Sequence, residues 1–370
     1  MVDILPYLSL TTYLVITVCL LRYSPYFSNV MSSDCRPLAY YFVAVSSLFV
    51  AFLYGFRDID SVHGGIDTKA YQDIFLSLDV SDASTFFNQR VEKGYVLIMW
   101  IVKSLGLNFS HFMMVFYLLL CLFFYKISLF LTRNWTLIFS VLMLSVIFLE
   151  SFNISRMSLA TLVFFYAFIS LTLGKKIKAF AYIFFAISLQ ITFLWGGFVV
   201  LYYVLINKIS RQYRLFIHIG FFLLSFLAVQ VFKDALSFIG YSHYLNIQDA
   251  DIKPSYLNYI FVMMLLLING LFLKDKIDNA ISKSIMTVLP SMMFIIPFYS
   301  ALPIAYRFNY IYFPMIAFII PDIYIASRKI KIALPIKIGM ALIPIVYVLL
   351  KVNSYYTKDI EYLLNWKVTF

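Results

Sequence analysis

Long apolar runs, separated by short polar segments, dominate the pattern of hydrophobic and polar positions along the chain. A run of about 20 apolar residues can cross a bilayer as a helix, and a shorter run can do so when it is packed or tilted. No stretch of about ten residues alternates between apolar and polar positions as a barrel strand does. The pattern therefore predicts an all-α, polytopic integral membrane protein with about 12 transmembrane helices. The expected spans are 5–21, 38–56, 109–130, 135–149, 157–173, 178–190, 191–207, 213–232, 256–273, 284–300, 303–320 and 334–351.

Two places depart from this regular pattern. The runs 178–190 and 191–207 follow each other without a polar loop, which predicts a broken pair of helices that meet at Gln190 and Thr192. The run 94–107 is apolar but short and contains Lys103. We expect it to be a re-entrant or interfacial helix, which is tolerated at membrane depth where it lines a cavity of the protein.

The composition supports a membrane protein. Apolar residues make up 63% of the 370 residues and charged residues 13%, whereas about a quarter of an ordinary soluble domain is charged. A soluble protein of this length lacks the polar surface needed to cover so much apolar material. No soluble linker or repeat interrupts the chain, so we expect one transmembrane domain over residues 1–370. The run 5–21 has no basic segment before it and no cleavage site after it, which indicates a retained span rather than a signal peptide.

The net charge of +11 is spread over short loops and does not gather on one polar face. Lys and Arg concentrate in alternate loops such as 174–178, 208–214 and 328–337, which we expect to be cytoplasmic. The acidic loop 57–93 and the loop 233–255 are then extracytoplasmic, as are both termini. This distribution does not favour nucleic acid as a partner. The three cysteines are too scattered for a disulfide framework or a thiolate metal site.

Three arginines stand at the expected outer ends of apolar runs, namely Arg57, Arg156 and Arg307. An arginine near the bilayer centre costs about 2.5–3.5 kcal/mol by insertion scales. A single arginine at a helix end could simply extend its head group to the interface. Three on the same side, against the usual charge asymmetry, predict a shared anion site, because guanidinium groups bind phosphate oxygens in bidentate fashion. Tyr310 lies near Arg307 and could stack on a sugar or belong to the aromatic belt of the membrane interface.

Two carboxylates on the expected outer side are candidates for proton transfer. Asp67 stands at the start of a short helix expected from Thr68 to about residue 78, where it could cap the helix or accept a sugar hydroxyl proton, and capping is the favoured interpretation. Tyr71 lies one turn later on the same face. Glu92, just before Tyr95, is harder to explain as a cap and is the preferred functional carboxylate. Glu150 could neutralise Arg156 or be a solvated charge at a span end.

Several short motifs follow one another along the chain in an order that resembles that of a known family. They are Phe56-Arg57, Gly65-Ile66-Asp67 with Tyr71, Glu92 with Gly94-Tyr95, Arg156-Met157-Ser158-Leu159-Ala160, and Tyr306-Arg307 with Tyr312-Phe313. Together they resemble the EpsG-like family of bacterial exopolysaccharide polymerases and Wzy-type O-antigen polymerases, over about residues 50–320. Two positions depart from the family pattern, since Met157 replaces a common glutamine and Gln190 a common histidine. An amide does not titrate near neutral pH, so a proton-carrying role does not transfer to Gln190.

The resemblance implies a GT-C-like membrane glycosyltransferase that polymerises repeat units linked to undecaprenyl pyrophosphate. It also implies a multi-pass protein of the bacterial inner (cytoplasmic) membrane, with its active site facing the periplasm or outside, and contact with a chain-length regulator protein. We expect no metal and no other cofactor, because arginines can supply the countercharge and no metal-binding aspartate pair stands out.

The implied reaction assigns roles to the candidate residues. The departing pyrophosphate needs stabilisation of its charge, for which Arg156 and Arg307 are the first choices and Arg57 the third. The acceptor hydroxyl needs a base, for which Glu92 is preferred and Asp67 is the reserve. Further substrate-binding candidates are Tyr71, Tyr95, Gln190 and Tyr310.

Two other functions fit parts of the pattern. A flippase or transporter of lipid-linked oligosaccharide would bind pyrophosphate through the same arginines, but its cationic residues should line a cavity across both leaflets. A sugar acyltransferase would use an intramembrane histidine, and His111 and His218 have no obvious carboxylate partner in the sequence. The concentration of unusual charges on one side favours the polymerase.

Overall fold

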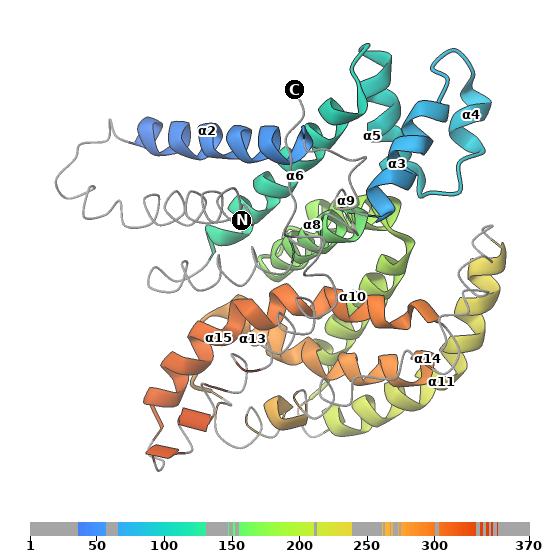
Figure 1. Cartoon of the computed structure of the whole chain (residues 1–370). Coiled ribbons are helices and arrows are strands. Elements are labelled where there is room, and N and C mark those ends of the chain that lie inside the picture. The colour runs from blue at the N-terminus through green and yellow to red at the C-terminus, as the bar shows by residue number, and fades with distance from the viewer. Residues whose placement is uncertain are drawn as a thin grey trace, which may run out of the picture. The chain divides into compact units, whose positions relative to one another are not determined.

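The computed structural model describes residues 36–56, 66–130, 155–210, 213–238, 275–299 and 303–330, with single residues and runs of two to four residues elsewhere. Every regular element in these ranges is helical, and none is a strand (Figure 1), which confirms the all-α prediction. The elements are α2 (Arg36–Gly55), α3 (Ile66–Ser77), α4 (Ala83–Phe87), α5 (Lys93–Ser104), α6 (Phe109–Ser128), α8 (Ser155–Thr172), α9 (Lys176–Leu189), η4 (Ile191–Phe193), α10 (Leu194–Lys208), α11 (Arg214–Phe238), α13 (Ala280–Val288), η8 (Leu289–Ile295), α14 (Ile296–Tyr299), η9 (Pro303–Ile311) and α15 (Tyr312–Arg328).

Six stretches of helix within the described ranges are long and apolar enough to cross a membrane. They are Phe109–Ser128, Ser155–Thr172, Ile191–Lys208, Phe216–Asp234, Ala280–Tyr299 and Arg307–Arg328. The protein is therefore a membrane protein. The expected spans 5–21 and 135–149, and most of 256–273 and 334–351, lie outside the described residues. The expected total of about 12 spans stays a prediction.

The chain divides into two compact units. The first comprises Met1–Tyr166, Phe184–Ile191 and Leu350–Phe370, and the second comprises Ala167–Ile183 and Thr192–Leu349. Of the two expected outer loops, 57–93 belongs to the first unit, where it forms α3 and α4 after residue 65. The loop 233–255 belongs to the second unit and lies outside the described residues beyond 238.

In the first unit, α2 packs along α6 through a close approach at Gly55. A Cβ placed on Gly55 would lie 2.8 Å from the backbone nitrogen of Met114. Real Cβ atoms do not come this close to backbone, so a side chain at this position would push the two helices apart. Glycine is used here because it lets two backbones meet.

Two lysines secure the helices that lead to the candidate site. Lys103 of α5 donates to the carbonyl oxygens of Phe75, Leu76 and Leu78, at 2.9, 2.8 and 2.5 Å. The first two carbonyls belong to the last turn of α3 and the third to the residue that follows the helix, so the ammonium group acts as its C-terminal cap. Lys93 in turn donates to the carbonyl oxygen of Phe87, at 2.8 Å, just where α4 ends.

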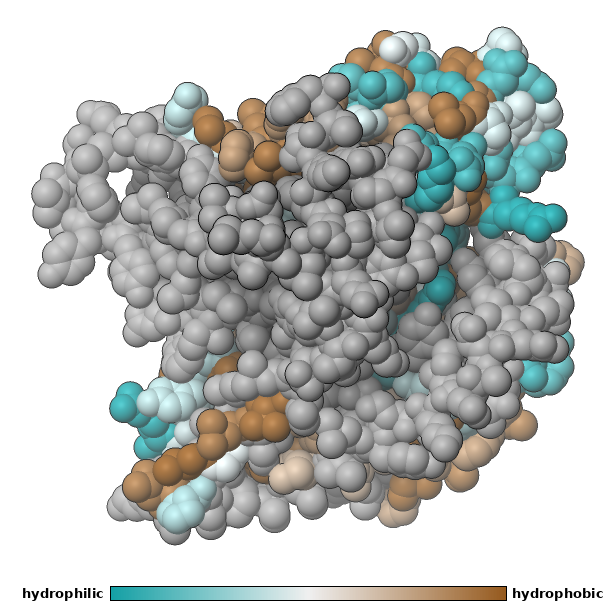
Figure 2. All heavy atoms as spheres, in the orientation of Figure 1, coloured by the Kyte–Doolittle hydropathy of each residue, from teal (hydrophilic) through white to brown (hydrophobic). Residues whose placement is uncertain are grey.

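Helices α3, α4 and α5 present both polar and apolar residues at the surface (Figure 2). The carboxylates of Asp79 and Asp82 are exposed, while Leu97 and Ile101 form an exposed apolar row on α5. A short helix with one apolar exposed face agrees with the expected re-entrant or interfacial role of 94–107, and its depth in the membrane stays a prediction.

In the second unit, an aromatic core surrounds Trp195 of α10. The indole ring stacks on Phe198 and Phe308, with ring centroids 4.6 and 5.3 Å apart. Its Nε1 donates to the Tyr312 hydroxyl at 3.2 Å, and that hydroxyl also lies 2.7 Å from Ser291 Oγ. The polar tips of two buried aromatic side chains are thereby satisfied inside an apolar bundle.

The last described helix runs further than the sequence predicts. The expected span ended at residue 320, before Pro321 and Asp322, yet α15 continues through both residues to Arg328. The Asp322 carboxylate accepts hydrogen bonds from Asn279 Nδ2, at 2.9 Å, and from Ser282 Oγ, both at the start of α13. Because residues at the start of α13 supply these donors, a buried carboxylate is accommodated inside α15.

Candidate functional site

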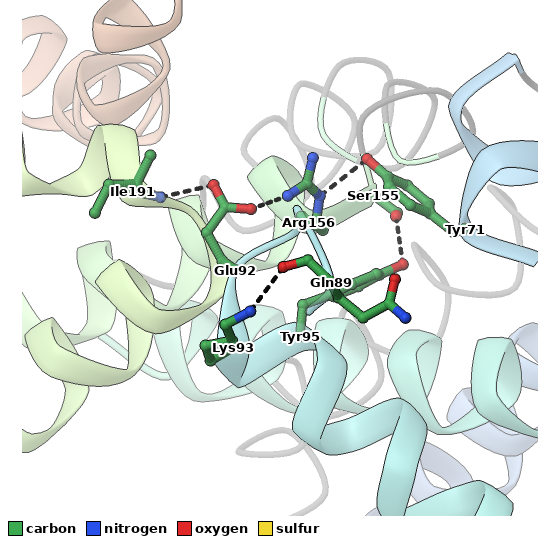
Figure 3. A network of polar contacts seen from close by, with 8 residues as sticks. All are labelled: Tyr71, Gln89, Glu92, Lys93, Tyr95, Ser155, Arg156 and Ile191. Atoms are coloured by element: carbon green, nitrogen blue, oxygen red, sulfur yellow. Dashed lines mark hydrogen bonds and ion pairs between the residues drawn. The ribbon is translucent and has the colours of Figure 1, made fainter. Parts of the chain in front are cut away.

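A buried ion pair between Glu92 and Arg156 forms the centre of the candidate site (Figure 3). Arg156 Nη1 donates to Glu92 Oε2. Glu92 is 2% exposed and Arg156 is 8% exposed, so both charges are removed from solvent. Removing a charge from water is costly unless a partner and further hydrogen bonds compensate it. All of the residues involved belong to the first unit.

Local structure explains how each partner reaches this position. Arg156 is the second residue of α8, where the positive end of the helix dipole disfavours a cation, so the nearby carboxylate compensates it. Glu92 stands at the N-cap position of α5 but makes no side-chain hydrogen bond to the amides of that helix. Its carboxylate points to Arg156 instead, which agrees with the expectation that Glu92 is not a cap.

The second carboxylate oxygen of Glu92 contacts the backbone at the break between α9 and α10. Glu92 Oε1 accepts a hydrogen bond of 3.0 Å from the backbone N–H of Ile191. The chain leaves α9 at Leu189, passes Gln190 and starts the short η4 at Ile191, which confirms the predicted break near Gln190 and Thr192. Backbone N–H groups at a helix start have no partner within the helix, and the carboxylate supplies one.

Two tyrosines and a serine surround the guanidinium group. Arg156 Nε donates to the Tyr71 hydroxyl at 3.0 Å, and the guanidinium carbon lies 5.1 Å from the Tyr71 ring centroid and 5.8 Å from that of Tyr95. Cations are attracted to the faces of such rings. The Tyr95 hydroxyl lies 3.0 Å from Ser155 Oγ, so Tyr95 is itself fixed to the start of α8.

Gln190 lies next to this network and carries an unsatisfied group. Its side chain is 1% exposed, and its Nε2 has no hydrogen-bond partner within the described part of the chain. An unsatisfied buried donor costs about 1–3 kcal/mol. Such groups are rare in folded proteins and concentrate where a polar partner can be bound.

Lys93 follows Glu92 directly but does not belong to the ion pair. Its ammonium group donates to the carbonyl oxygen of Phe87 at 2.8 Å. It also donates to the carbonyl oxygen of Gln89 at 2.7 Å (Figure 3). Nearby, the Asp79 carboxylate accepts hydrogen bonds from the Ser81 hydroxyl and amide, which hold the pKa of Asp79 below its usual value. Among the described residues, no group of His, Cys, Asp and Glu side chains has an arrangement that could hold a metal ion.

The structure brings together four of the residues singled out in the sequence, namely Glu92, Arg156, Tyr71 and Tyr95. Gln190 directly precedes Ile191, which contacts Glu92. Asp67 lies in the first turn of α3, because this helix begins at Ile66 rather than at Thr68. A carboxylate in a first turn still interacts favourably with the helix dipole.

The remaining candidates belong to the second unit or are not described. Arg307 and Tyr310 are partly exposed residues of η9 in the second unit. Arg57 lies outside the described residues, as does Glu150, the counterion that the sequence offered for Arg156. The convergence of the three arginines therefore stays a prediction.

Two participants were not identified from the sequence. Ser155 holds Tyr95 in place, and the amide of Ile191 binds Glu92. The polar pair Ser155-Arg156 at a helix start was a sequence signal that could have identified Ser155. A backbone amide carries no sequence signal, although the helix break at position 190 indicated where one would be exposed.

Comparison with protein families gives one match. The sequence model of the EpsG family matches residues 40–365, which is most of the chain. Neither the comparison with curated proteins nor that with solved structures yields a match. The family match spans the candidate site in the first unit and the η9 and α15 region in the second.

Proposed function

The chain belongs to the EpsG family, and from that premise we propose that it polymerises glycan repeat units linked to undecaprenyl pyrophosphate. Membership indicates a polysaccharide-polymerase-like membrane protein. We further propose that the product is an O-antigen or a related surface polysaccharide. The reaction takes place on the periplasmic or outer side of the bacterial inner membrane, and the protein works with a chain-length regulator.

The reaction transfers the growing glycan to an incoming lipid-linked repeat unit. A hydroxyl oxygen of the acceptor sugar attacks the anomeric carbon of the donor glycan. The bond between that carbon and the pyrophosphate oxygen breaks, and the lipid pyrophosphate leaves with the electron pair. The hydroxyl proton passes to a base, so the site needs a fixed cation for the leaving group and a proton acceptor for the nucleophile.

The observation that carries the proposal is the buried pair of Arg156 and Glu92 beside two tyrosines. A guanidinium group keeps its charge at every physiological pH and matches the geometry of phosphate oxygens. In this proposal Arg156 binds the pyrophosphate, Glu92 accepts the proton, and the faces of Tyr71 and Tyr95 lie against substrate. Arg307 and Arg57 contribute further positive charge, with Asp67 as the alternative base.

A gene deletion distinguishes polymerisation from translocation. Loss of the polymerase leaves single repeat units on the lipid carrier, exposed on the outer leaflet, and removes the ladder of longer chains seen on a gel. A flippase would instead leave the carrier-linked unit in the cytoplasmic leaflet. Persistence of long chains in the deletion strain, or retention of the single units in the cytoplasmic leaflet, would refute the polymerase assignment.

A substitution tests the role of the arginine directly. Arg156→Ala should abolish the ladder while the protein remains in the membrane at normal level. Arg328→Ala is the matched control, because Arg328 is an exposed arginine at the end of α15. A normal ladder from Arg156→Ala would exclude Arg156 as the pyrophosphate ligand.

A further inference from the structure

The surroundings of the Glu92 carboxylate have the features of a phosphate site. One oxygen faces the Arg156 guanidinium and the other accepts from the amide of Ile191, the first residue of η4. A permanent cation combined with a backbone N–H at a helix start is a recurrent arrangement for binding phosphate. In this protein an anion already fills that arrangement, and the anion is a side chain of the protein itself.

Resting on the proposed function, we propose that Glu92 occupies the subsite of a substrate phosphate group. This phosphate subsite is defined by Arg156 Nη1 and the Ile191 N–H. When the pyrophosphate enters, it replaces the carboxylate on both donors. Glu92 then becomes free of its counterion and able to accept the proton of the acceptor hydroxyl. The Ile191 amide is thereby a substrate ligand, and the base is released only when the donor is bound.

The energetics of buried ion pairs favour such an exchange. The attraction within a buried pair is largely offset by the loss of hydration of both charges, and a second anion that takes over both donors keeps the charge of Arg156 compensated. Removing the carboxylate without a replacement would instead leave Arg156 buried and uncompensated. A pyrophosphate carries more negative charge and more acceptor oxygens than a carboxylate, so it can satisfy the same donors.

Gln190 supplies a second, independent observation. Its buried side-chain nitrogen lacks a partner within the described residues and belongs to the residue that immediately precedes the Ile191 amide. A carboxylate has two oxygens, and both are already used by Arg156 and Ile191. A phosphate offers a further oxygen for a third donor, which a carboxylate in the same position cannot provide.

The proposal is tested by measuring how tightly the full-length protein binds inorganic pyrophosphate. The protein is placed in phosphatidylcholine nanodiscs, so that no anionic lipid head group competes, and titrated by calorimetry at neutral pH. Glu92→Gln removes the internal anion and should bind pyrophosphate at least about tenfold more tightly than the unchanged protein. Asp73→Asn removes the same charge from an exposed position on α3 and should leave the affinity unchanged.

A second variant allows the test to be made if Glu92→Gln does not fold. Glu92→Asp keeps the charge but shortens the side chain by one methylene, which draws the carboxylate away from Arg156. The carboxylate then competes less well with pyrophosphate for Arg156. Its affinity for pyrophosphate should also rise, and pyrophosphate should raise its thermal unfolding midpoint more than that of the unchanged protein. Affinities equal to or lower than that of the unchanged protein, in whichever of the two variants folds, would overturn the proposal.

Arg156→Ala separates this proposal from the proposed function. If it loses pyrophosphate binding while the Glu92 variants gain none, Arg156 binds pyrophosphate but Glu92 does not occupy its position. If Arg156→Ala binds pyrophosphate as tightly as the unchanged protein, the assignment of Arg156 to the leaving group fails, and the displacement of Glu92 fails with it.

Discussion

Gly94 lies so close to Ser188 that a Cβ at position 94 would be 2.2 Å from the serine hydroxyl oxygen and 2.7 Å from its backbone oxygen. The hydroxyl can rotate away, but the backbone oxygen cannot. This approach holds the start of α5 against the end of α9, where Glu92 reaches the amide of Ile191. The glycine is therefore part of the geometry of the site although it makes no polar contact.

Gly94→Ala should separate the two segments and weaken the bond between Glu92 and Ile191. We expect a stability loss of about 1–3 kcal/mol, typical of overpacking, and a marked reduction of polymer per folded molecule. Thermal unfolding in detergent and a gel of the glycan ladder measure the two effects. Gly220→Ala is the control, because a Cβ at Gly220 meets nothing within 4 Å. Equal behaviour of the two variants would contradict the role of this contact.

Tyr71→Phe should lower polymerisation about tenfold, the effect expected when a charged donor loses its hydrogen-bond acceptor. The phenyl ring still faces the Arg156 guanidinium, so the folded structure should persist. Polymer yield per folded molecule is the measurement. Tyr213→Phe removes a hydroxyl from an exposed tyrosine and should change nothing. Full activity of Tyr71→Phe would show that the bond from Arg156 Nε is not needed.

Lys103→Met should loosen the end of α3, because three carbonyl oxygens lose their common donor. We expect faster amide hydrogen exchange in α3 and a loss of about 1–3 kcal/mol in stability. Lys176→Met, at an exposed position on α9, is the control. Unchanged exchange in α3 would show that the ammonium group is not its cap.

Asp322→Ala should destabilise the packing of α15 on α13. The Asn279 amide and the Ser282 hydroxyl would lose their acceptor, at a cost of about 1–3 kcal/mol. Asp322→Asn keeps an acceptor oxygen and should cost less. Thermal unfolding midpoints measure both, and equal midpoints for Asp322→Ala and the unchanged protein would contradict this account.

The Asp79 carboxylate should contribute to stability at neutral pH and lose that contribution only in acid. Its pKa is lowered in the folded protein by the Ser81 hydroxyl and amide. The stabilisation is therefore complete above the usual aspartate pKa of about 3.9 and disappears as the pH falls through the lowered value. Asp79→Asn should reduce the unfolding midpoint by the same amount at pH 6 and pH 8. A reduction that differs between these two values would contradict the assignment.

The sequence predicted those parts of the fold and the site that depend on local pattern. The length of the apolar runs predicted the helices, and the missing polar loop predicted the break at Gln190. The sequence also singled out Glu92 and Arg156 as functional, but not as partners. They are 64 residues apart, and their pairing depends on the tertiary arrangement of the chain, which no local pattern encodes.

The continuation of α15 beyond residue 320 is a second feature that local sequence patterns do not predict. Pro321 and Asp322 are ordinary signs of a helix end or of a loop. The tolerance of the Asp322 carboxylate depends on donors at Asn279 and Ser282, which are 43 and 40 residues away in the chain. Local sequence rules fail at this point because the compensating groups come from a different helix.

A structure of the full-length protein with undecaprenyl pyrophosphate bound would show whether Arg156 holds the leaving diphosphate. We expect phosphate oxygens within hydrogen-bond distance of the Arg156 guanidinium and the Ile191 amide, with Glu92 displaced from both. A diphosphate bound elsewhere, beside an intact pair of Glu92 and Arg156, would contradict this expectation.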